Sequence, residues 1–160
     1  MTDATGKARL RPMRPDEFAA FMAHSIEGYA RDIETNGGQT AEFARQKSEA
    51  DHAAVLPHGL ETTGHWIHVV EAGGEQVGLL WLAERDSGGR RVLFIYDVEI
   101  DEAHRGKGYG RAAMELAEQE AKALGIGRIE LNVFGGNDVA RRLYRSMDYV
   151  ETSVQMAKDL

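Results

Sequence analysis

The sequence contains no cysteine, and this absence excludes disulfide bonds, thiolate metal ligands and a covalent cysteine acyl-enzyme. It also contains no run approaching the ~18 apolar residues that a membrane-spanning helix needs. The first ten residues, MTDATGKARL, lack the apolar core of a signal peptide. We therefore expect a cytoplasmic protein that has no membrane partner.

The sequence has fewer basic than acidic residues. The chain carries 19 lysine and arginine residues against 26 aspartate and glutamate residues, which gives a formal net charge of -7. This balance argues against a nucleic-acid partner and favours a cationic partner where the acidic residues gather near a site. A length of 160 residues with 42% hydrophobic content predicts one globular domain over residues 1–160.

The most informative stretch is residues 92–113, which read VLFIYDVEIDEAHRGKGYGRAA. Its first five residues are apolar and include β-branched and aromatic side chains, a composition typical of a strand covered on both faces. A loop with three glycines follows at residues 105–110, and apolar residues recur at helical spacing from Tyr109 onward. The stretch therefore predicts a strand, a glycine loop and a helix.

A glycine loop before a helix favours an anion. Backbone N–H groups can approach a ligand there without obstruction by Cβ atoms, and the helix N-terminus adds about half a positive charge. Arg105, Lys107 and Arg111 strengthen the preference for a phosphate or pyrophosphate. A dinucleotide fingerprint is disfavoured, because the next strand ends without the acidic residue which that fingerprint requires. A connector without a ligand is the remaining alternative.

The rest of the chain predicts further elements from periodicity and turn residues. The expected order is β-α-α-β-β-β-α-β-α-β. The expected segments are a strand at 8–13, a helix from Asp16 to about 36, a helix capped by Thr40, a loop at 56–64, strands at 65–71, 76–84 and 92–100, a helix ending near Leu124, a strand at 129–134, a helix from Asn137 through Met147, and a final strand at 149–156.

Two motifs carry a resemblance to a known family. Arg105-x-x-Gly108-x-Gly110 resembles the acyl-coenzyme A loop of the GNAT superfamily of N-acetyltransferases, written there as Q/R-x-x-G-x-G/A. Residues 137–144, NDVARRLY, look like the family's N-x-x-A-x-x-L-Y helix. The two motifs have the right order and separation, so together they are much more specific than either alone. One departure is Asp148, at a position that is often glycine in the family.

The resemblance implies an α/β fold with a GNAT-like mixed, mostly antiparallel sheet of about six or seven strands, flanked by helices. The sheet would splay between the strands at 92–100 and 129–134. It also implies acetyl-CoA as cosubstrate, with its pantetheine arm in the opening, and no metal. The cofactor-binding residues would be Val98, Ile100, Arg105, Gly106, Lys107, Gly108, Tyr109, Gly110, Arg111 and Asn137.

Two carboxylates are candidates for handling the amine proton. An alkylamine has a pKa of about 10.4, so deprotonation before attack needs a base or a water chain. Asp97 and Glu99 lie two apart on the expected strand and would share a face with Ile95. We predict that Glu99 accepts the proton, with Asp97 orienting the cationic amine or exchanging roles with it. The alternative is that Glu99 lies at the solvent end of the strand and Asp97 pairs with an arginine, and a β-bulge would alter the facing.

Tyr144 is the candidate acid, as the resemblance implies. Its phenol can donate a proton to the departing thiolate. The alternative is a core role, because Tyr144 belongs to an apolar helical stripe. Asn137 is either a helix N-cap alone or an N-cap that also contacts the cofactor. A backbone N–H near residues 98–100 would stabilise the oxyanion. His65 and His68 would face opposite sides of a strand, so they would not form a metal pair. His52 and His58 could line an acceptor pocket.

The predicted activity is transfer of an acetyl group from acetyl-CoA to a primary amine of a small molecule, by direct attack in a ternary complex. Alternatives are a protein N-terminal or lysine acetyltransferase of the ribosomal-protein type, a non-catalytic acyl-CoA sensor, and transfer of a longer acyl group. We expect residues 56–64 to shape the acceptor site. The oligomeric state stays open, with a homodimer as one option.

Overall fold

The structure, a computed structural model, describes residues 8–160. Its elements are β1 (Arg9–Pro12), α1 (Pro15–Gly37), α2 (Ala41–Val55), the 3-10 helix η1 (Gly59–Glu61), β2 (His65–Ala72), β3 (Glu75–Ser87), β4 (Arg90–Ile100), the 3-10 helix η2 (Glu102–His104), α3 (Tyr109–Ala123), β5 (Ile129–Leu131) and α4 (Asp138–Ser146). The expected order is confirmed up to α4. None of the helices within residues 8–160 is long and apolar enough to cross a bilayer.

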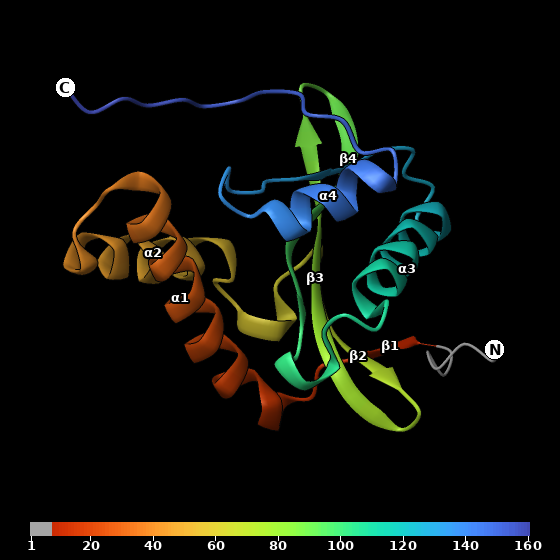
Figure 1. The fold of residues 1–160 in the computed structure, drawn as a ribbon. Helices are drawn as coiled ribbons and strands as arrows, with labels where there is room; N and C mark the ends of the chain where they lie inside the picture. The colour runs from red at the N-terminus through yellow and green to blue at the C-terminus, as the bar shows by residue number, and fades with distance from the viewer. Residues whose placement is uncertain (1–7) are drawn as a thin grey trace.

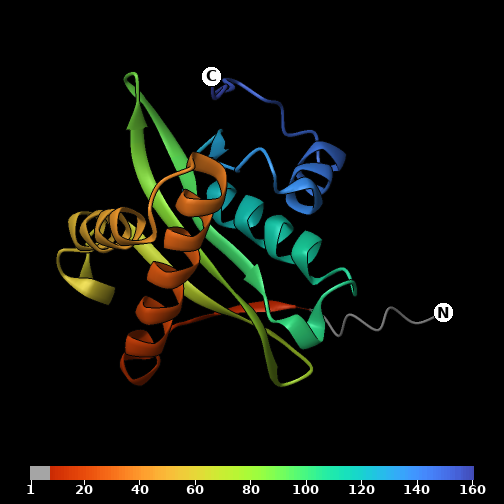
Figure 2. The same ribbon diagram turned by 60° about the vertical axis from the view of Figure 1, so that its left-hand side comes forward.

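One five-stranded sheet forms the centre of the fold, with the strands in sequence order from β1 to β5. All neighbours are antiparallel except β4 and β5, which are parallel. Helices α1 and α2 cover one face of the sheet and α3 covers the other (Figures 1 and 2). The mixed, mostly antiparallel α/β sheet flanked by helices is therefore confirmed, with five strands in place of the six or seven expected.

Each face of the sheet has its own core. The α3 face packs small residues of the helix, among them Ala113 and Ala117, against Leu80, Leu82 and Leu93, all nearly inaccessible to water. The α1 face packs Phe21, Leu56, Ile67, Leu79 and Trp81. Because alanines form the sheet-facing side of α3, the helix can lie close to the strands. This closeness positions the loop before α3 beside the end of β4.

A β-bulge in β4 changes which side chains face α1. Trp81 pairs with Asp97, but Leu82 pairs with Ile95, so Tyr96 is the extra residue. Ile95 packs in the α3-face core. The prediction that Ile95 shares a face with the two carboxylates is therefore wrong, because the bulge shifts the alternation by one residue.

The sheet opens between its last two strands. The parallel ladder joins only Leu93 to Ile129, Phe94 to Glu130 and Ile95 to Leu131. Beyond this point β4 continues to Ile100 without β5 beside it, so the expected splay is confirmed. The strand expected at 129–134 ends at Leu131. Helix α4 packs against the start of α3, where Leu143 approaches Gly110.

The expected strand at 149–156 is absent. Residues 149–160 form no helix or strand, and residues 150–160, here called the C-terminal tail, are exposed. The tail extends away from the body of the protein (Figure 1). The strand prediction is wrong for this structure because a strand needs a partner for its backbone groups, and no strand of the sheet pairs with these residues.

Candidate active site

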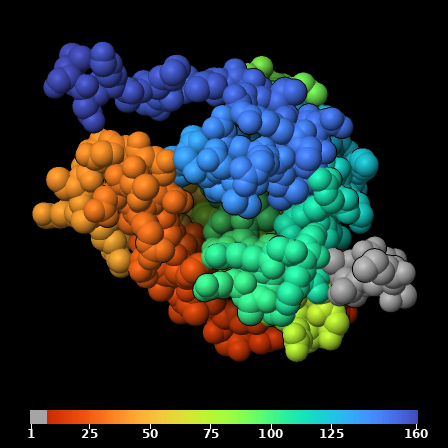
Figure 3. Space-filling view, in the orientation of Figure 1, coloured from red at the N-terminus to blue at the C-terminus, as the bar shows by residue number. Residues whose placement is uncertain are grey.

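A cleft lies between α1, α4 and the loop before α3. Figure 3 shows this hollow, with residues of the sheet visible at its floor. The floor includes the second half of β4, where Asp97 is paired with Trp81 and Glu99 with Leu79. Because directly paired residues point to the same side of a sheet and both partners belong to the α1-face core, the two carboxylates face α1.

The loop before α3 presents a row of free backbone donors. Gly106 and Gly108 have positive φ values of 71° and 88°. The first helical hydrogen bond of α3 runs from the Ala112 N–H to the Gly108 carbonyl, at 3.1 Å. The N–H groups of residues 106–111 donate to no acceptor within residues 8–160. Six consecutive donors at a helix N-terminus form an arrangement that suits an anion.

Three basic side chains surround this row. The Arg105 Nε donates to the Ile100 carbonyl at 2.9 Å, and the Lys107 Nζ donates to the Ala103 carbonyl at 3.0 Å. The Arg111 guanidinium donates to the Ser146 hydroxyl of α4 at 2.5 Å. The structure therefore places the predicted basic residues around the loop, and the first of them also ties the loop to the end of β4.

The Glu99 carboxylate has a partner that the sequence did not reveal. His24, on α1, has its Nε2 at 2.9 and 2.8 Å from the two carboxylate oxygens. The Arg105 guanidinium lies further away, at 3.8 Å. The Glu99 side chain is 31% exposed and that of His24 is 59% exposed. The pair therefore bridges α1 and β4 at the solvent side of the cleft.

The pKa of Asp97 is strongly raised. Loss of hydration is the largest cause and the Glu99 charge is the next, and together they raise the pKa of Asp97 from 3.8 to about 7. The nearby Asp32 of α1 adds to the increase, whereas His24 opposes it. No arginine pairs with Asp97 within the described residues, so the predicted alternative of such a pair is not observed.

Tyr144 approaches the cleft from the other side of the sheet. Burial raises the pKa of its phenol, and the charge of Asp97 raises it further. Its ring packs with the α3-face core and lies 6.0 Å from the ring of Tyr149. Tyr144 and Asp97 belong to opposite faces, so the opening between β4 and β5 is what brings them within electrostatic range.

The remaining predicted cofactor residues lie on β4, α3 and the N-cap of α4. Val98 and Ile100 lie on β4 beyond the end of the β5 ladder. Asn137 is the N-cap of α4, and its side chain accepts a hydrogen bond from the Ala140 N–H at 3.2 Å. The capping role of Asn137 is therefore confirmed. Tyr109 is 8% exposed and belongs to the α3-face core, so its side chain is structural and only its backbone faces the loop.

His52 and His65 have structural roles. His52 is 6% exposed, with its Nε2 at 2.9 Å from the Ser25 hydroxyl and its Nδ1 at 2.8 Å from the Ser48 carbonyl. It therefore fixes α2 to α1 and does not line an acceptor pocket. His65 accepts a hydrogen bond from the Trp81 indole N–H at 3.1 Å. Sequence reasoning missed His24, because this residue lies beside the apolar stripe of α1 and has the pattern of a surface residue.

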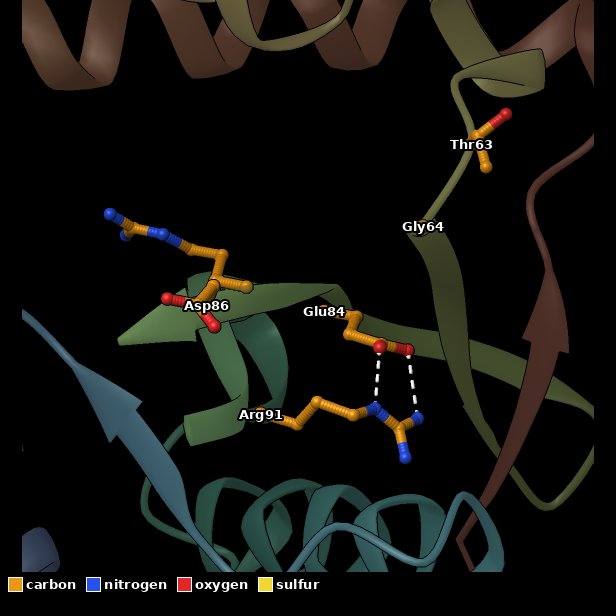
Figure 4. Close-up of a pocket in the computed structure, with 6 residues that line it drawn as sticks. Thr63, Gly64, Glu84, Asp86 and Arg91 are labelled. Atoms are coloured by element: carbon orange, nitrogen blue, oxygen red, sulfur yellow. Dashed lines mark hydrogen bonds and ion pairs between the residues drawn. The ribbon is translucent and has the colours of Figure 1, made fainter. Parts of the chain in front are cut away.

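A separate hollow of about 360 Å³ lies near the β3–β4 turn. It is lined by Thr63, Gly64, Glu84, Arg85, Asp86 and Arg91. Figure 4 shows Arg91 donating two hydrogen bonds to Glu84, at 2.6 and 3.1 Å. The charges of this pair compensate each other, and the hollow is remote along β4 from Glu99. The cleft beside α1 is therefore the stronger candidate for chemistry.

Comparison with known proteins agrees with this geometry. Residues 26–149 match the acetyltransferase (GNAT) family. The uncharacterized N-acetyltransferases YdgE and YycN of Bacillus subtilis are each 34% identical over 152 residues, which cover 94% of this chain and 97% of theirs. The crystal structure of YycN superposes with a TM-score of 0.90 at 33% identity, covering 96% of this chain and 98% of that one.

A more distant relative has a named substrate. Streptothricin acetyltransferase of Streptomyces lavendulae is 30% identical over 114 residues, which cover 71% of this chain and 53% of that protein. The match to the family spans most of the chain, and the relatives that share nearly its full length are N-acetyltransferases. The chain therefore belongs to the GNAT family and is an acetyltransferase enzyme.

Proposed function

We propose that this enzyme transfers an acetyl group from acetyl-CoA to a primary amine of a small molecule, by direct attack in a ternary complex. One observation carries the proposal: the row of six free N–H groups at residues 106–111 lies beside a cleft that holds Asp97, Glu99 and Tyr144. The anion-binding loop and the proton-transfer groups are thus adjacent.

The residues present fit acetyl-CoA. The N–H groups of residues 106–111 would hold the pyrophosphate, with Arg105, Lys107 and Arg111 adding positive charge. Val98 and Ile100 would bind the pantetheine arm along the part of β4 that β5 leaves free, and Asn137, the N-cap of α4, would also contact the cofactor. When bound, acetyl-CoA supplies the thioester from which the acetyl group leaves.

The carboxylates would prepare the amine. A general base works best when its pKa lies near the working pH, and Asp97, at about 7, meets this condition. We therefore assign proton acceptance to Asp97 in place of Glu99, which is the alternative that the sequence analysis left open. Glu99, held by His24 near the mouth of the cleft, would orient the cationic amine.

Tyr144 would complete the transfer. Asp97 would first take one proton from the cationic amine, which makes the nitrogen a nucleophile. As the C–N bond forms and the C–S bond breaks, Tyr144 would give its phenolic proton to the thiolate, and the second proton that the nitrogen loses would restore the phenol. The raised pKa of Tyr144 keeps its phenol protonated at neutral pH, as an acid requires. A backbone N–H of β4 near Val98 would stabilise the oxyanion.

The charge of the cleft supports a cationic acceptor. Asp97, Glu99 and Asp32 converge on it, with His24 as their nearest counter-charge. Streptothricin acetyltransferase, the more distant relative, is named for a small molecule, which is consistent with this choice. A small amine is therefore the acceptor class that we propose, in preference to a protein N-terminus or lysine.

The direct test is release of free thiol from acetyl-CoA across a panel of polyamines, amino acids, aminoglycosides and peptides. We expect turnover with at least one small primary amine. Turnover restricted to peptides would replace the small-molecule acceptor with a protein. Thermal stabilisation by acetyl-CoA without thiol release from any amine would favour a sensor in place of an enzyme.

The loop itself can be tested with matched glycine variants. Gly106 and Gly88 both have positive φ, 71° and 63°, and a Cβ on either meets no atom within 4 Å. Gly106→Ala and Gly88→Ala should lose similar stability, about 1 kcal/mol each. Only Gly106→Ala should weaken acetyl-CoA binding, by roughly tenfold or more, because its Cβ projects beside the donor row. Isothermal titration calorimetry measures the affinity of each variant for acetyl-CoA. Equal affinities would reject the loop as the pyrophosphate site.

A further inference from the structure

Helix α1 has a glycine at a position where a helix is weakened by one. Gly28 lies in the middle of this helix, whereas the other glycines of the α-helices within residues 8–160, Gly37 and Gly110, lie in terminal turns. A glycine inside a helix is less favourable than an alanine, because its backbone loses more conformational freedom. Packing does not require Gly28 either, since a Cβ on this residue would meet no atom within 4 Å. The missing side chain therefore leaves a space that the described part of the protein does not use.

This space faces the carboxylates of β4. His24 and Asp32 lie one helical turn before and after Gly28, so the three residues form one stripe along α1. His24 contacts the Glu99 carboxylate, and the charges of both His24 and Asp32 influence the pKa of Asp97. The stripe therefore lines the wall of the cleft opposite the two β4 carboxylates, with Gly28 at its centre.

Two contacts of α1 lie on either side of Gly28. On one side, His24 joins the helix to Glu99 of β4. On the other side, Asn36 reaches the loop before α4, where its Oδ1 would lie 3.1 Å from a Cβ on Gly136. Asn36 follows His24 by twelve residues, which corresponds to about 18 Å of helix. Gly28 lies between these two contacts, beside the hollow that Figure 3 shows.

The negative charges of the cleft exceed its positive charges. Asp32 makes no ion pair within residues 8–160, and the neighbouring Arg31 is paired with Glu27 at 3.0 Å. Loss of hydration raises the pKa of Asp32, and the Glu99 charge adds to this increase although Arg31 opposes it. Asp32 and the two carboxylates of β4 thus share one histidine as their counter-charge. A ligand with two positive charges would compensate this excess better than a ligand with one.

We propose that the acceptor is a linear diamine or a longer polyamine, with one amino group at Asp97, a second, cationic group at Asp32, and the aliphatic chain against the open backbone of Gly28. Only the amine at Asp97 reacts, and the amine at Asp32 stays protonated and holds the chain in place. A side chain at position 28 would occupy the path of the aliphatic chain. The inference deepens the proposed function and rests on it, because it names the acceptor of the same cleft.

The first experiment compares 1,4-diaminobutane and spermidine with pentylamine, in which a methyl group replaces the second amine of the diamine. With saturating acetyl-CoA, kcat/KM for at least one of the two polycations should exceed that for pentylamine by about tenfold or more. Asp32→Asn should reduce this ratio to less than about threefold, because the second cation loses its partner. Glu34→Gln, which neutralises an exposed carboxylate of the same helix, is the matched control and should keep the ratio. A wild-type ratio near one would overturn the inference and leave the proposed acetyl transfer intact.

The glycine can be tested by adding side chains of increasing size. Gly28→Ala should raise the melting temperature by about 2–4 °C, because alanine is the better helix former. Gly28→Leu should lower kcat/KM for 1,4-diaminobutane by about tenfold or more, because the larger side chain fills the space beside the helix. Its affinity for acetyl-CoA should not change. Ala23→Leu, at an exposed position of α1, is the matched control and should retain activity. Full activity of Gly28→Leu would show that the acceptor does not pass this point.

A binding measurement separates this inference from the proposed reaction. Isothermal titration of 1,4-diaminobutane into the enzyme in the presence of coenzyme A requires no turnover. The affinity should fall by about tenfold in Asp32→Asn and should be unchanged in Glu34→Gln. If no amine releases thiol but binding still depends on Asp32, the proposed reaction fails and the diamine site stands. Binding that is equal in wild type and Asp32→Asn, or absent from both, would overturn the site.

Discussion

At the scale of single residues, Asp97 is the group whose environment matters most for pH dependence. Its pKa is 3.8 without the fold and about 7 within it. Between these values the folded state holds a proton that the unfolded state has released, so stability falls as pH rises from about 4 to 7. A difference of this size corresponds to at most about 4 kcal/mol. Four titratable groups interact with the charge of Asp97, namely Glu99, His24, Asp32 and Tyr144.

Asp97→Asn should separate the catalytic and structural effects of this carboxyl group. The variant should be more stable than the wild type at pH 8, by up to a few kcal/mol, and equally stable near pH 4. Its turnover at pH 8 should fall by roughly 10²–10⁴-fold, because a general base is lost. Urea denaturation and a pH-rate profile measure the two effects.

The control for this change is Glu34→Gln, which neutralises an exposed carboxylate on α1. It should alter neither stability nor rate. If Asp97→Asn retained the rising limb of the wild-type profile near pH 7, another group would have to be the base.

His24→Gln should move the pH-rate profile. His24 offsets the charge of Glu99 and lowers the pKa of Asp97. Without it the two carboxylates repel more strongly, so the rising limb should shift to higher pH by about half a unit to one unit. Glu27→Gln, which breaks an exposed ion pair with Arg31 on the same helix, is the matched control and should leave the limb in place. A limb unchanged by His24→Gln would show that the pair has no influence on proton transfer.

At the scale of elements, the sequence predicted features that depend on one element alone. It did not predict features that depend on contacts between two elements. Glycines at 106–110 predicted the strand-loop-helix, and Thr40 and Asn137 predicted helix caps, because each acts through its own backbone. The facing of Ile95 was wrong because the pairing of β4 with β3 sets the bulge. The role of His24 depends on α1 lying over β4, which no local pattern encodes.

The turn after α4 offers a test of backbone strain. Asp148 has φ of 65° and is the only residue other than glycine with positive φ within residues 8–160. Asp148→Gly should stabilise the protein by about 1 kcal/mol, because glycine adopts this conformation without cost. The melting temperature should rise by about 2–4 °C in differential scanning calorimetry. Asp148→Ala distinguishes strain from charge, since a rise with alanine would show that removal of the carboxylate is responsible.

At the scale of the whole molecule, the net charge of -7 and the acidic cleft act in the same direction on a cationic substrate. With saturating acetyl-CoA, kcat/KM for a cationic amine should fall severalfold between about 20 mM and about 300 mM salt, as the Debye length shortens. An aromatic amine that is neutral at the same pH is the control and should show little dependence. Equal salt responses for both amines would indicate that the charge of the cleft does not guide the acceptor.

The extra residue at Tyr96 makes the effect of a deletion in β4 depend on where the residue is lost. Without Tyr96, Ile95 and Asp97 would be consecutive opposite Leu82 and Trp81, so the ladder would continue without a bulge and Asp97 would still face α1. Loss of Val98 would instead send Glu99 into the apolar layer under α3 and Ile100 toward α1. Homologous chains should accordingly tolerate loss of the bulge but conserve the residue count of the strand beyond it.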